Sequence, residues 1–468
     1  MRVLSFVLLL IFTTACASTP RRPAAIDFTG PTDSILLMSD FHFDPLFDPA
    51  LLPALIQQSD ASQWEAIFEN SQIKSLSPYR ADANFVTLKS ALEAMKKADP
   101  SPRFIIVGGD FLPHKFEKRF AELAPTSSDK FKPFADETLR FLALMVQKYF
   151  PNSLIMPAVG NNDDACGDYL IQPQGPSLNA FAKTWAPAAN RSSSSPSFIS
   201  SVGSAGHYTE LVPAIDGGQT LRAIVINGVY WSPRYLNTCG NASATPGAAE
   251  LSWLEQRLEE SQKAGEKVWL INHIPAGIDV ATTQFKDPKY CMTKKFTMMI
   301  NEEPNRKYLD LIRKYHSTIA ATINGHTHYN EYRVYGEKQE AVLAITIPSI
   351  APNHENNPGF QILTVDPATF AIHNSSVYGI DVDPSATNPV WDKLYDFNQF
   401  FQQTELSASS LSQILETEKT DDAAGKDRYS RFMNSGAKPS GFMVHNWDLY
   451  TCAMTHGTAE TVSECACK

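Results

Sequence analysis

Short, continuous apolar runs recur along this chain, and such runs are typical of strands that are buried on both faces of a parallel sheet. Five of them stop abruptly at a polar side chain or a glycine turn. Because α/β proteins place their sites just beyond the carboxyl ends of parallel strands, we expect these polar residues to form one site along the whole sheet. The runs are residues 34–39 before Asp40, 104–107 before Asp110, 154–159 before Asn161, 267–271 before His273, and 318–323 before His326.

Helical patterns separate the apolar runs. Asn84 is a suitable N-cap for a helix whose apolar residues Phe85, Leu88 and Leu92 recur at helical spacing. Further helices are expected at about residues 135–149 and 249–264, and further strands at 221–227, 341–347 and 360–365. This alternation predicts an α/β fold built from βαβ units.

The pattern changes again near the C-terminus. From about Pro389 the apolar residues Leu394, Phe397 and Phe401 follow helical spacing, and a second such group continues to Leu415. We therefore expect a small C-terminal helical subdomain that packs on the core.

The polar residues that end the runs share one chemistry. Carboxylate and amide oxygens together with neutral imidazoles suit borderline divalent ions, so we expect zinc, with manganese or iron as alternatives. Seven such donors are too many for one four-coordinate ion, but they fit two ions if one carboxylate bridges them. Two ions roughly 3.5–4 Å apart suit the hydrolysis of a phosphate ester or anhydride. The candidate ligands are Asp40, His42, Asp110, Asn161, His273, His326 and His328.

These residues also form known motifs. Asp40-x-His42, Gly109-Asp110, Gly160-Asn161-Asn162-Asp163, the isolated His273 and Gly325-His326-x-His328 resemble, in this order, the calcineurin-like metallophosphoesterases. Finer features resemble the acid-sphingomyelinase-like phosphodiesterase branch of that superfamily. They are His114 four residues after Asp110, Asn272-His273-Ile-Pro-Ala-Gly277, and Asn357-Pro-Gly359.

The resemblance implies a two-sheet β-sandwich flanked by helices. It also implies that Asp40, His42 and His328 hold one ion, that Asn161, His273 and His326 hold the other, and that Asp110 bridges them. A hydroxide between the two ions would attack phosphorus in line. His114 matches the residue expected to protonate the leaving group, for which an imidazole is well suited.

One position departs from the superfamily pattern. Most members have Asn-His where this chain has Asn161-Asn162. Asn162 can donate a hydrogen bond to a phosphate oxygen, but it has no proton to transfer at neutral pH. Either His114 alone supplies the acid or the leaving group departs without help, as from a phosphoanhydride. His354 is a further candidate for substrate binding, with a plain surface histidine as the alternative.

Three functions therefore remain open. The first is phosphodiester hydrolysis, as in the sphingomyelinase-like branch. The second is hydrolysis of phosphoanhydrides by a polyphosphatase or nucleotide pyrophosphatase. The third is a catalytically weak phosphate-binding protein on the same fold, which the Asn162 substitution favours.

Composition restricts the partners. The 468 residues carry a formal net charge of −10 and contain no run of lysine or arginine, which argues against nucleic acid and anionic membrane surfaces. We expect a small-molecule or lipid-headgroup phosphoester as the substrate. The sequence contains no transmembrane segment and does not indicate an oligomeric state.

The N-terminus has the features of an export signal. Arg2 precedes a short apolar run, and Ala15-x-Ala17 suits cleavage after Ala17, although Cys16 could instead be lipidated as in a lipoprotein. We expect a signal peptide at 1–17, a spacer at 18–30, a catalytic domain at 31–385 and the helical subdomain at 386–468. The protein would then be exported, either secreted or periplasmic.

The cysteines agree with export. Without Cys16, six of the seven cysteines remain, which suggests up to three disulfides with many possible pairings. Cys452 with Cys465 or Cys467 would tie down the end of the chain. Cys166, close to Asn161, could be a metal thiolate, but a disulfide is the preferred interpretation.

Overall fold

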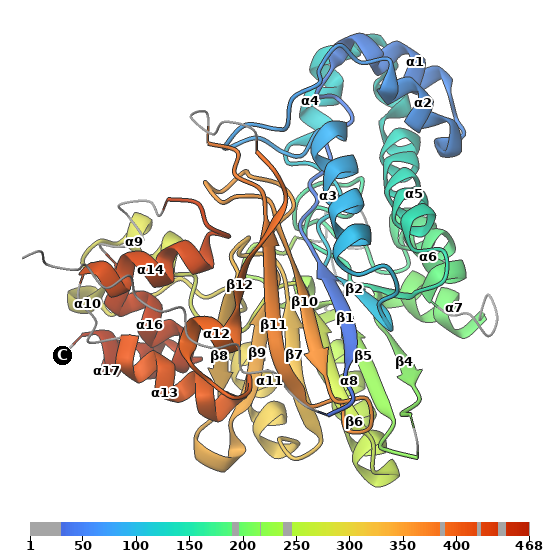
Figure 1. Cartoon of the computed structure of the whole chain (residues 1–468). Coiled ribbons are helices and arrows are strands. Elements are labelled where there is room, and N and C mark those ends of the chain that lie inside the picture. The colour runs from blue at the N-terminus through green and yellow to red at the C-terminus, as the bar shows by residue number, and fades with distance from the viewer. Residues whose placement is uncertain are drawn as a thin grey trace, which may run out of the picture.

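Two six-stranded sheets form the centre of the computed structural model, as Figure 1 shows. The structure describes residues 30–189, 196–215, 217–236, 246–383, 389–418, 423–438 and 446–467. The first sheet has the order β12-β11-β10-β1-β2-β3 and the second has the order β4-β5-β6-β7-β9-β8. The strands are β1 (Asp33–Met38), β2 (Phe104–Val107), β3 (Leu154–Pro157), β4 (Tyr208–Val212), β5 (Leu221–Ile226), β6 (Lys267–Asn272), β7 (Ile319–Asn324), β8 (Glu331–Tyr335), β9 (Val342–Thr346), β10 (Gly359–Val365), β11 (Ile372–Gly379) and β12 (Asp392–Asp396). The predicted two-sheet fold is confirmed.

The apolar runs are parallel strands, central in their sheets except for β3, which lies at the edge of the first sheet. β1, β2 and β3 pair in parallel in the first sheet, and β5, β6, β7 and β9 pair in parallel in the second. The β2 residues Phe104–Val107 are all buried, as expected for a strand covered on both faces. The expectation of one site along a single sheet is wrong, since β1, β2 and β3 belong to one sheet and β6 and β7 to the other. Face-to-face packing of the two sheets brings their carboxyl ends together.

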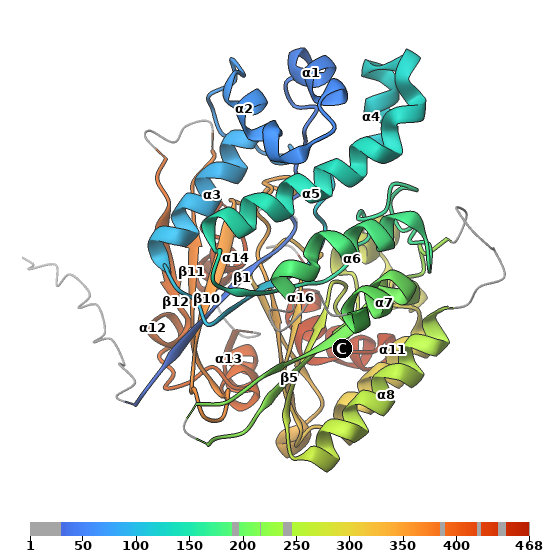
Figure 2. The ribbon, with the colours of Figure 1, turned by 90° about the vertical axis from the view of Figure 1, so that its right-hand side faces the viewer.

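Helices cover the outer faces of the sheets. Figures 1 and 2 show that α1 to α6 lie together at one end and side of the first sheet, whereas α7, α8 and α11 lie beside the second. The α-helices described before residue 315 are α1 (Leu52–Gln57), α2 (Trp64–Glu69), α3 (Phe85–Ala98), α4 (Phe116–Leu123), α5 (Phe131–Tyr149), α6 (Pro176–Ala189), α7 (Pro196–Ala205), α8 (Pro246–Ala264), α9 (Val280–Lys286), α10 (Tyr290–Thr293) and α11 (Glu302–Lys314).

The sequence signals for helices correspond to real elements. The side chain of Asn84 caps α3 by accepting a hydrogen bond from the backbone N of Thr87 at 2.9 Å. The helices expected at 135–149 and 249–264 are α5 and α8, and both begin a few residues earlier than expected. Helix ends are the least certain part of a periodic pattern, even where, as in α5, the first turn buries Phe131 and Phe134 in the core.

The C-terminal part is helical, but it begins with a strand. Leu394 lies in β12, which pairs with β11, so the helix expected from Pro389 is wrong over these residues. Helices follow at α12 (Phe397–Phe401), α13 (Ala408–Glu418), α14 (Ala423–Met433), α16 (Trp447–Thr455) and α17 (Ala459–Ala466). Figure 1 shows them beside α9, α10 and the β8 edge of the second sheet. The domain boundary near residue 385 stays a prediction.

Disulfides fasten this helical part. Cys452 bonds to Cys465, which joins α16 to α17, and Cys291 in α10 bonds to Cys467. The first pairing is one of the two that the sequence suggested. Cys166 is also disulfide-bonded, so its thiolate is not available to a metal ion.

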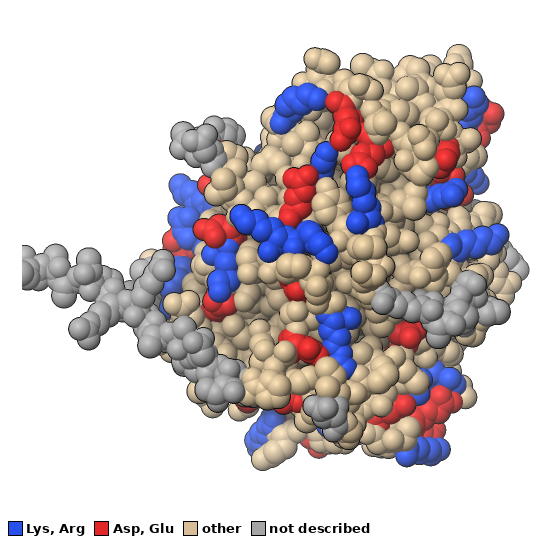
Figure 3. Space-filling view, turned by 45° about the vertical axis from the view of Figure 1, so that its right-hand side comes forward, with Lys and Arg blue, Asp and Glu red and all other residues tan. Residues whose placement is uncertain are grey.

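Two further expectations concern the surface and the termini. Among the described residues, no helix is both long and apolar enough to cross a bilayer. On the face drawn in Figure 3, acidic and basic side chains are interspersed. The expected signal peptide, Cys16 and most of the spacer lie outside the described residues.

Candidate metal centre

The candidate ligands meet where the carboxyl ends of the two sheets converge. Asp40 and His42 follow β1, Asp110 follows β2, and Asn161 follows β3. From the second sheet, His273 follows β6, and His326 and His328 follow β7. Six of the seven are buried, and His326 is partly exposed.

Several of these residues have a strained backbone. Asp40, His42, Asp110, His326 and His328 have positive φ values of 51°, 38°, 56°, 73° and 67°. Non-glycine residues rarely adopt this conformation, and it persists only where the surrounding structure enforces it. The strand ends therefore turn sharply so that each side chain points into the space between the sheets.

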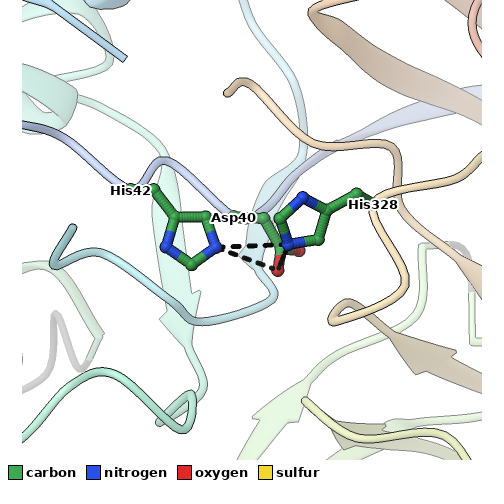
Figure 4. Close-up of side chains that lie close together, drawn as sticks. All are labelled: Asp40, His42 and His328. Carbon is green, nitrogen blue, oxygen red and sulfur yellow. Dashed lines mark hydrogen bonds and ion pairs between the residues drawn. The ribbon is translucent and has the colours of Figure 1, made fainter. Parts of the chain in front are cut away.

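Asp40, His42 and His328 form the first group. Nε2 of His328 lies 3.3 Å from Oδ1 of Asp40 and 3.2 Å from Nε2 of His42. Nε2 of His42 lies 3.8 Å from the same carboxylate oxygen. Figure 4 shows the two imidazole rings on either side of the Asp40 carboxylate. The three side chains are close enough to share one ion.

Asp110, His273 and His326 form the second group, and Asn161 joins it. Nε2 of His273 lies 3.3 Å from Oδ2 of Asp110 and 3.1 Å from Oδ1 of Asn161. The same Asp110 oxygen lies 3.4 Å from Nε2 of His42 in the first group. Asp110 thus stands between the two groups, as a bridging carboxylate must.

The donor chemistry fits a cation in each group. Nδ1 of His273 lies 2.8 Å from the carbonyl oxygen of Gly108, and Nδ1 of His42 lies 3.1 Å from that of Leu112. A carbonyl oxygen only accepts, so each Nδ1 carries the proton and each Nε2 presents a lone pair to the site. Lone pairs and carboxylate oxygens therefore converge within 3.1–3.8 Å. Divalent ions would satisfy all of them.

The ionisation of the two carboxylates differs. Burial raises the pKa of Asp40 to about 7. Burial acts on Asp110 in the same direction, but the charge of His273, when that ring is protonated rather than metal-bound, outweighs burial, so the pKa of Asp110 lies below its ordinary range. Asp110 therefore stays ionised, which suits a ligand shared by two cations.

Asp163 holds the loops after β2 and β3 together. Its carboxylate accepts hydrogen bonds from the backbone N of Asp110 at 2.9 Å, of Phe111 at 2.7 Å and of Gly160 at 2.7 Å. Gly160 allows this close approach, because a Cβ there would collide with the Asp110 carboxylate. The sequence motif that contains Asp163 thus places one ligand and supports another.

Asn162 lies beside the bridging carboxylate. Its backbone N donates to Oδ1 of Asp110 at 2.8 Å, and its Nδ2 donates to Oδ2 at 3.0 Å. Asn162 also lines the cavity in front of the site. Its contact with a phosphate oxygen stays a prediction.

His114 and His354 both lie against the first group. The ring of His114 stacks on His42 at 4.1 Å, and the ring of His354 stacks on His328 at 4.1 Å. His354 is exposed and lines the same cavity as His114. The structure therefore brings every predicted site residue to one place, while their roles stay predictions.

Asp82 is a site residue that the sequence did not predict. Its Oδ1 accepts from Nδ1 of His114 at 2.9 Å and from Nδ2 of Asn353 at 2.8 Å, and its Oδ2 accepts from the backbone N of His114 at 2.8 Å. Burial alone would lower the pKa of His114, but Asp82 raises it above its ordinary value. Asp82 follows no apolar run, so no local pattern indicates it.

Asp168 was also missed. It accepts a hydrogen bond from Nδ2 of Asn161 at 2.7 Å, which directs Oδ1 of Asn161 toward His273 and the second group. Arg234 in turn pairs with Asp168 at 3.0 Å. The only sequence signal is that Asp168 shares a polar loop with Asn161.

Comparisons with known proteins agree with the geometry. No protein-family model matches the chain. The human acid sphingomyelinase-like phosphodiesterase 3b is 25% identical over 396 residues, which cover 81% of this chain and 78% of that protein. The cyclic GMP-AMP phosphodiesterase SMPDL3A of Bos taurus is 26% identical over 408 residues, which cover 84% and 81%.

Two further matches are more distant or shorter. The sphingomyelinase phosphodiesterase C of Dictyostelium discoideum is 25% identical over 365 residues and 74% of each chain. A solved dimetal phosphatase from Danio rerio has 11% identity and a TM-score of 0.42, with 78% of this chain and 100% of its own covered. The curated relatives confirm the predicted resemblance: this chain is similar to the acid-sphingomyelinase-like phosphodiesterases.

Proposed function

We propose that the protein is an exported phosphodiesterase that works with two divalent metal ions. One observation carries the proposal: Oδ2 of Asp110 lies 3.4 Å from Nε2 of His42 and 3.3 Å from Nε2 of His273. A carboxylate between two groups of ligands is the arrangement that a dinuclear centre requires. The relatives named above as phosphodiesterases support a diester as the substrate.

The chain's own residues would hold the ions and the proton. Asp40, His42 and His328 would bind one ion, Asn161, His273 and His326 would bind the other, and Asp110 would be shared. When bound, two such ions supply Lewis acidity and a hydroxide at neutral pH; zinc is the preferred metal, with manganese or iron as alternatives.

His114 would protonate the leaving alcohol. Its Nδ1 proton is held by Asp82 at 2.9 Å, so the second proton of the imidazolium is on Nε2. Nδ2 of Asn353 donates to the same Asp82 oxygen at 2.8 Å and helps to fix the carboxylate. Asn162, which has no transferable proton, would orient the phosphate and stabilise its oxygens. His354 would contact the substrate from the exposed side.

Hydrolysis of phosphoanhydrides is the second candidate, and Asn162 favours it. An anhydride leaves as an acidic phosphate and needs less protonation than an alkoxide. Export is proposed from the disulfides Cys291–Cys467 and Cys452–Cys465, because such bonds are typical of oxidising compartments.

A substrate panel tests the proposal. Purified protein loaded with zinc or manganese is assayed with bis-p-nitrophenyl phosphate, p-nitrophenyl phosphate, polyphosphate and nucleoside triphosphates. We expect the highest kcat/KM for the diester and its loss in Asp110→Ala, which excludes a contaminating enzyme. Turnover of monoesters alone or anhydrides alone would contradict the diesterase assignment.

A further inference from the structure

Two cavities open from the candidate metal centre in different directions. The His114 cavity, of about 520 Å³, includes His114, Asn162 and His328. The Tyr450 cavity, of about 530 Å³, includes Asp279 near α9, Met298 and Tyr450 of α16. Both volumes lie in the range of small-molecule binding sites, roughly 300–1,000 Å³.

The two cavities meet at the proposed metal ligands. Tyr169, Arg234, His326 and His354 line both of them. His326 belongs to the second group of ligands, so a phosphorus atom bound at the centre would face both cavities. A phosphomonoester has one organic substituent and would fill one cavity, whereas a diester has two and can fill both.

The position of His114 distinguishes the cavities. A general acid must reach the oxygen that leaves, so the departing alcohol belongs in the cavity that contains His114. The substituent that remains on phosphorus then extends into the Tyr450 cavity. The wall of that cavity comes mostly from residues 279–299 and 326–333, and Tyr450 of α16 closes it from the C-terminal part of the chain. Figure 1 shows α16 close to α9.

Disulfides hold this wall in place. Cys452, two residues after Tyr450, bonds to Cys465 in α17, and Cys291 in α10 bonds to Cys467. Tyr450 itself is only 5% exposed. The Tyr450 cavity is therefore preformed, which reduces the entropic cost of binding.

The lining of the Tyr450 cavity favours a flat organic group over a polyanion. Tyr169, Tyr329 and Tyr450 offer aromatic rings, and Met298 adds a polarisable apolar surface. The charges are largely paired within the protein. Nε of buried Arg333 lies 2.6 Å from Oε1 of Glu331.

The remaining charges do not favour an anion either. Arg234 pairs with Asp168 at 3.0 Å, and Asp279 caps α9 by accepting from the backbone N of Thr282 at 2.8 Å. Lys286 is the one lysine that lines the cavity, and the Asp279 carboxylate lies on the same lining. Because Arg234 and Arg333 are already paired, a chain of phosphates would find only one further lysine or arginine on this lining, Lys286.

We propose that the Tyr450 cavity binds the substituent that stays on phosphorus, and that it selects an uncharged organic group at least as large as an aromatic ring. This inference rests on the proposed diesterase function and deepens it. It assigns Tyr450 of α16 a part in substrate selection. Tyr450 is a specificity-determining residue.

The test keeps the leaving group constant and varies the retained group. Phenyl p-nitrophenyl phosphate and methyl p-nitrophenyl phosphate both release p-nitrophenolate, which is followed by its absorbance. The measured quantity is kcat/KM for the phenyl ester divided by kcat/KM for the methyl ester. We expect this ratio to be at least about tenfold higher in the wild-type protein than in a variant whose cavity is filled. Comparing the phenyl-to-methyl ratio between proteins cancels the intrinsic difference in reactivity.

Ala281→Trp fills the cavity from an exposed position at its edge. We expect the phenyl-to-methyl ratio to fall toward that of the uncatalysed reaction. Phe285→Ser is the matched control, because Phe285 lies on the same helix, is 86% exposed and does not line the cavity; its ratio should equal that of the wild type. An unchanged ratio in Ala281→Trp would overturn the inference.

A second measurement needs no variant. Phenyl phosphate, the product that would remain in the Tyr450 cavity, should inhibit the wild-type protein at least about tenfold more tightly than methyl phosphate. Equal inhibition constants would also overturn the inference while diester turnover persists. If neither diester is hydrolysed, the proposed function itself fails and this inference falls with it.

Discussion

Nδ1 of His114 lies 2.9 Å from Oδ1 of Asp82, a residue 32 positions earlier in the chain. The carboxylate also accepts from the backbone N of His114, so it fixes both the ring and its loop. A histidine held in this way has a defined tautomer and a pKa above its ordinary value. This pair leads to the first prediction.

His114→Ala should lower kcat about 10²–10⁴-fold for a diester with a poor alkoxide leaving group, because the acid is lost. With p-nitrophenolate as the leaving group the loss should be much smaller, since that anion departs without protonation. Steady-state kinetics over a series of leaving groups measures this difference. Asp82→Asn keeps the ring but loses the carboxylate and should lose about 10–100-fold. Equal losses for good and poor leaving groups would remove the acid role of His114.

Asp163→Asn should destabilise the protein by about 2–4 kcal/mol, because the new amide group places a donor against backbone N–H groups that are already donors. Three of those N–H groups belong to Asp110, Phe111 and Gly160. Urea unfolding followed by tryptophan fluorescence measures the change. The exposed Asp129→Asn is the matched control and should stay within about 0.5 kcal/mol of the wild type. A wild-type midpoint for Asp163→Asn would show that the loops do not depend on this carboxylate.

Asp136→Asn should stabilise the protein at neutral pH. Burial, followed by the charges of Asp164 and Glu137, raises the pKa of Asp136 from 3.8 to about 6. The folded state thus binds this proton more tightly than the unfolded state, so the ionised side chain costs stability above pH 6, and the cost disappears as pH falls toward 4. Its buried Oδ1 has no hydrogen-bond partner among the described residues, which agrees with this cost.

The expected gain is about 1–3 kcal/mol in the free energy of unfolding at pH 7.5, with little difference from the wild type near pH 4. Urea unfolding at both pH values measures it, with Asp129→Asn, at an exposed site, as the control that should stay within about 0.5 kcal/mol of the wild type. A gain that is equal at both values, or absent at pH 7.5, would contradict the role assigned to burial.

The apolar runs predicted the centre of both sheets because parallel strands buried on two faces leave a continuous apolar signal. β2 coincides with residues 104–107, and the ends of β1, β6 and β7 carry the expected ligands. The same principle could not assign the strands to two sheets. Sheet membership depends on contacts between distant residues, such as the pairing of Leu36 with Ile362.

Residues at edges and in loops were harder to predict. Leu394, Phe397 and Phe401 have helical spacing, yet Leu394 belongs to an edge strand whose pairing with β11 overrides the local pattern. Asp82 and Asp168 act through distant partners, so their functions depend on the tertiary structure. The metal ligands could be predicted because each one follows a strand directly and matches a motif.

The Asp110 carboxylate is expected to bind both ions. Metal analysis of the purified protein should find two divalent ions per chain in the wild type. Asp110→Ala removes the shared ligand and should lower the affinity for both ions, whereas His328→Ala removes a ligand of the first group and should chiefly affect one. Two tightly bound ions in Asp110→Ala would contradict a bridging role.

Anomalous diffraction from crystals grown with manganese or zinc tests the central claim most directly. The account predicts two peaks, one among Asp40, His42 and His328 and one among Asn161, His273 and His326, with the Asp110 carboxylate between them. A single peak, or peaks away from these side chains, would contradict it.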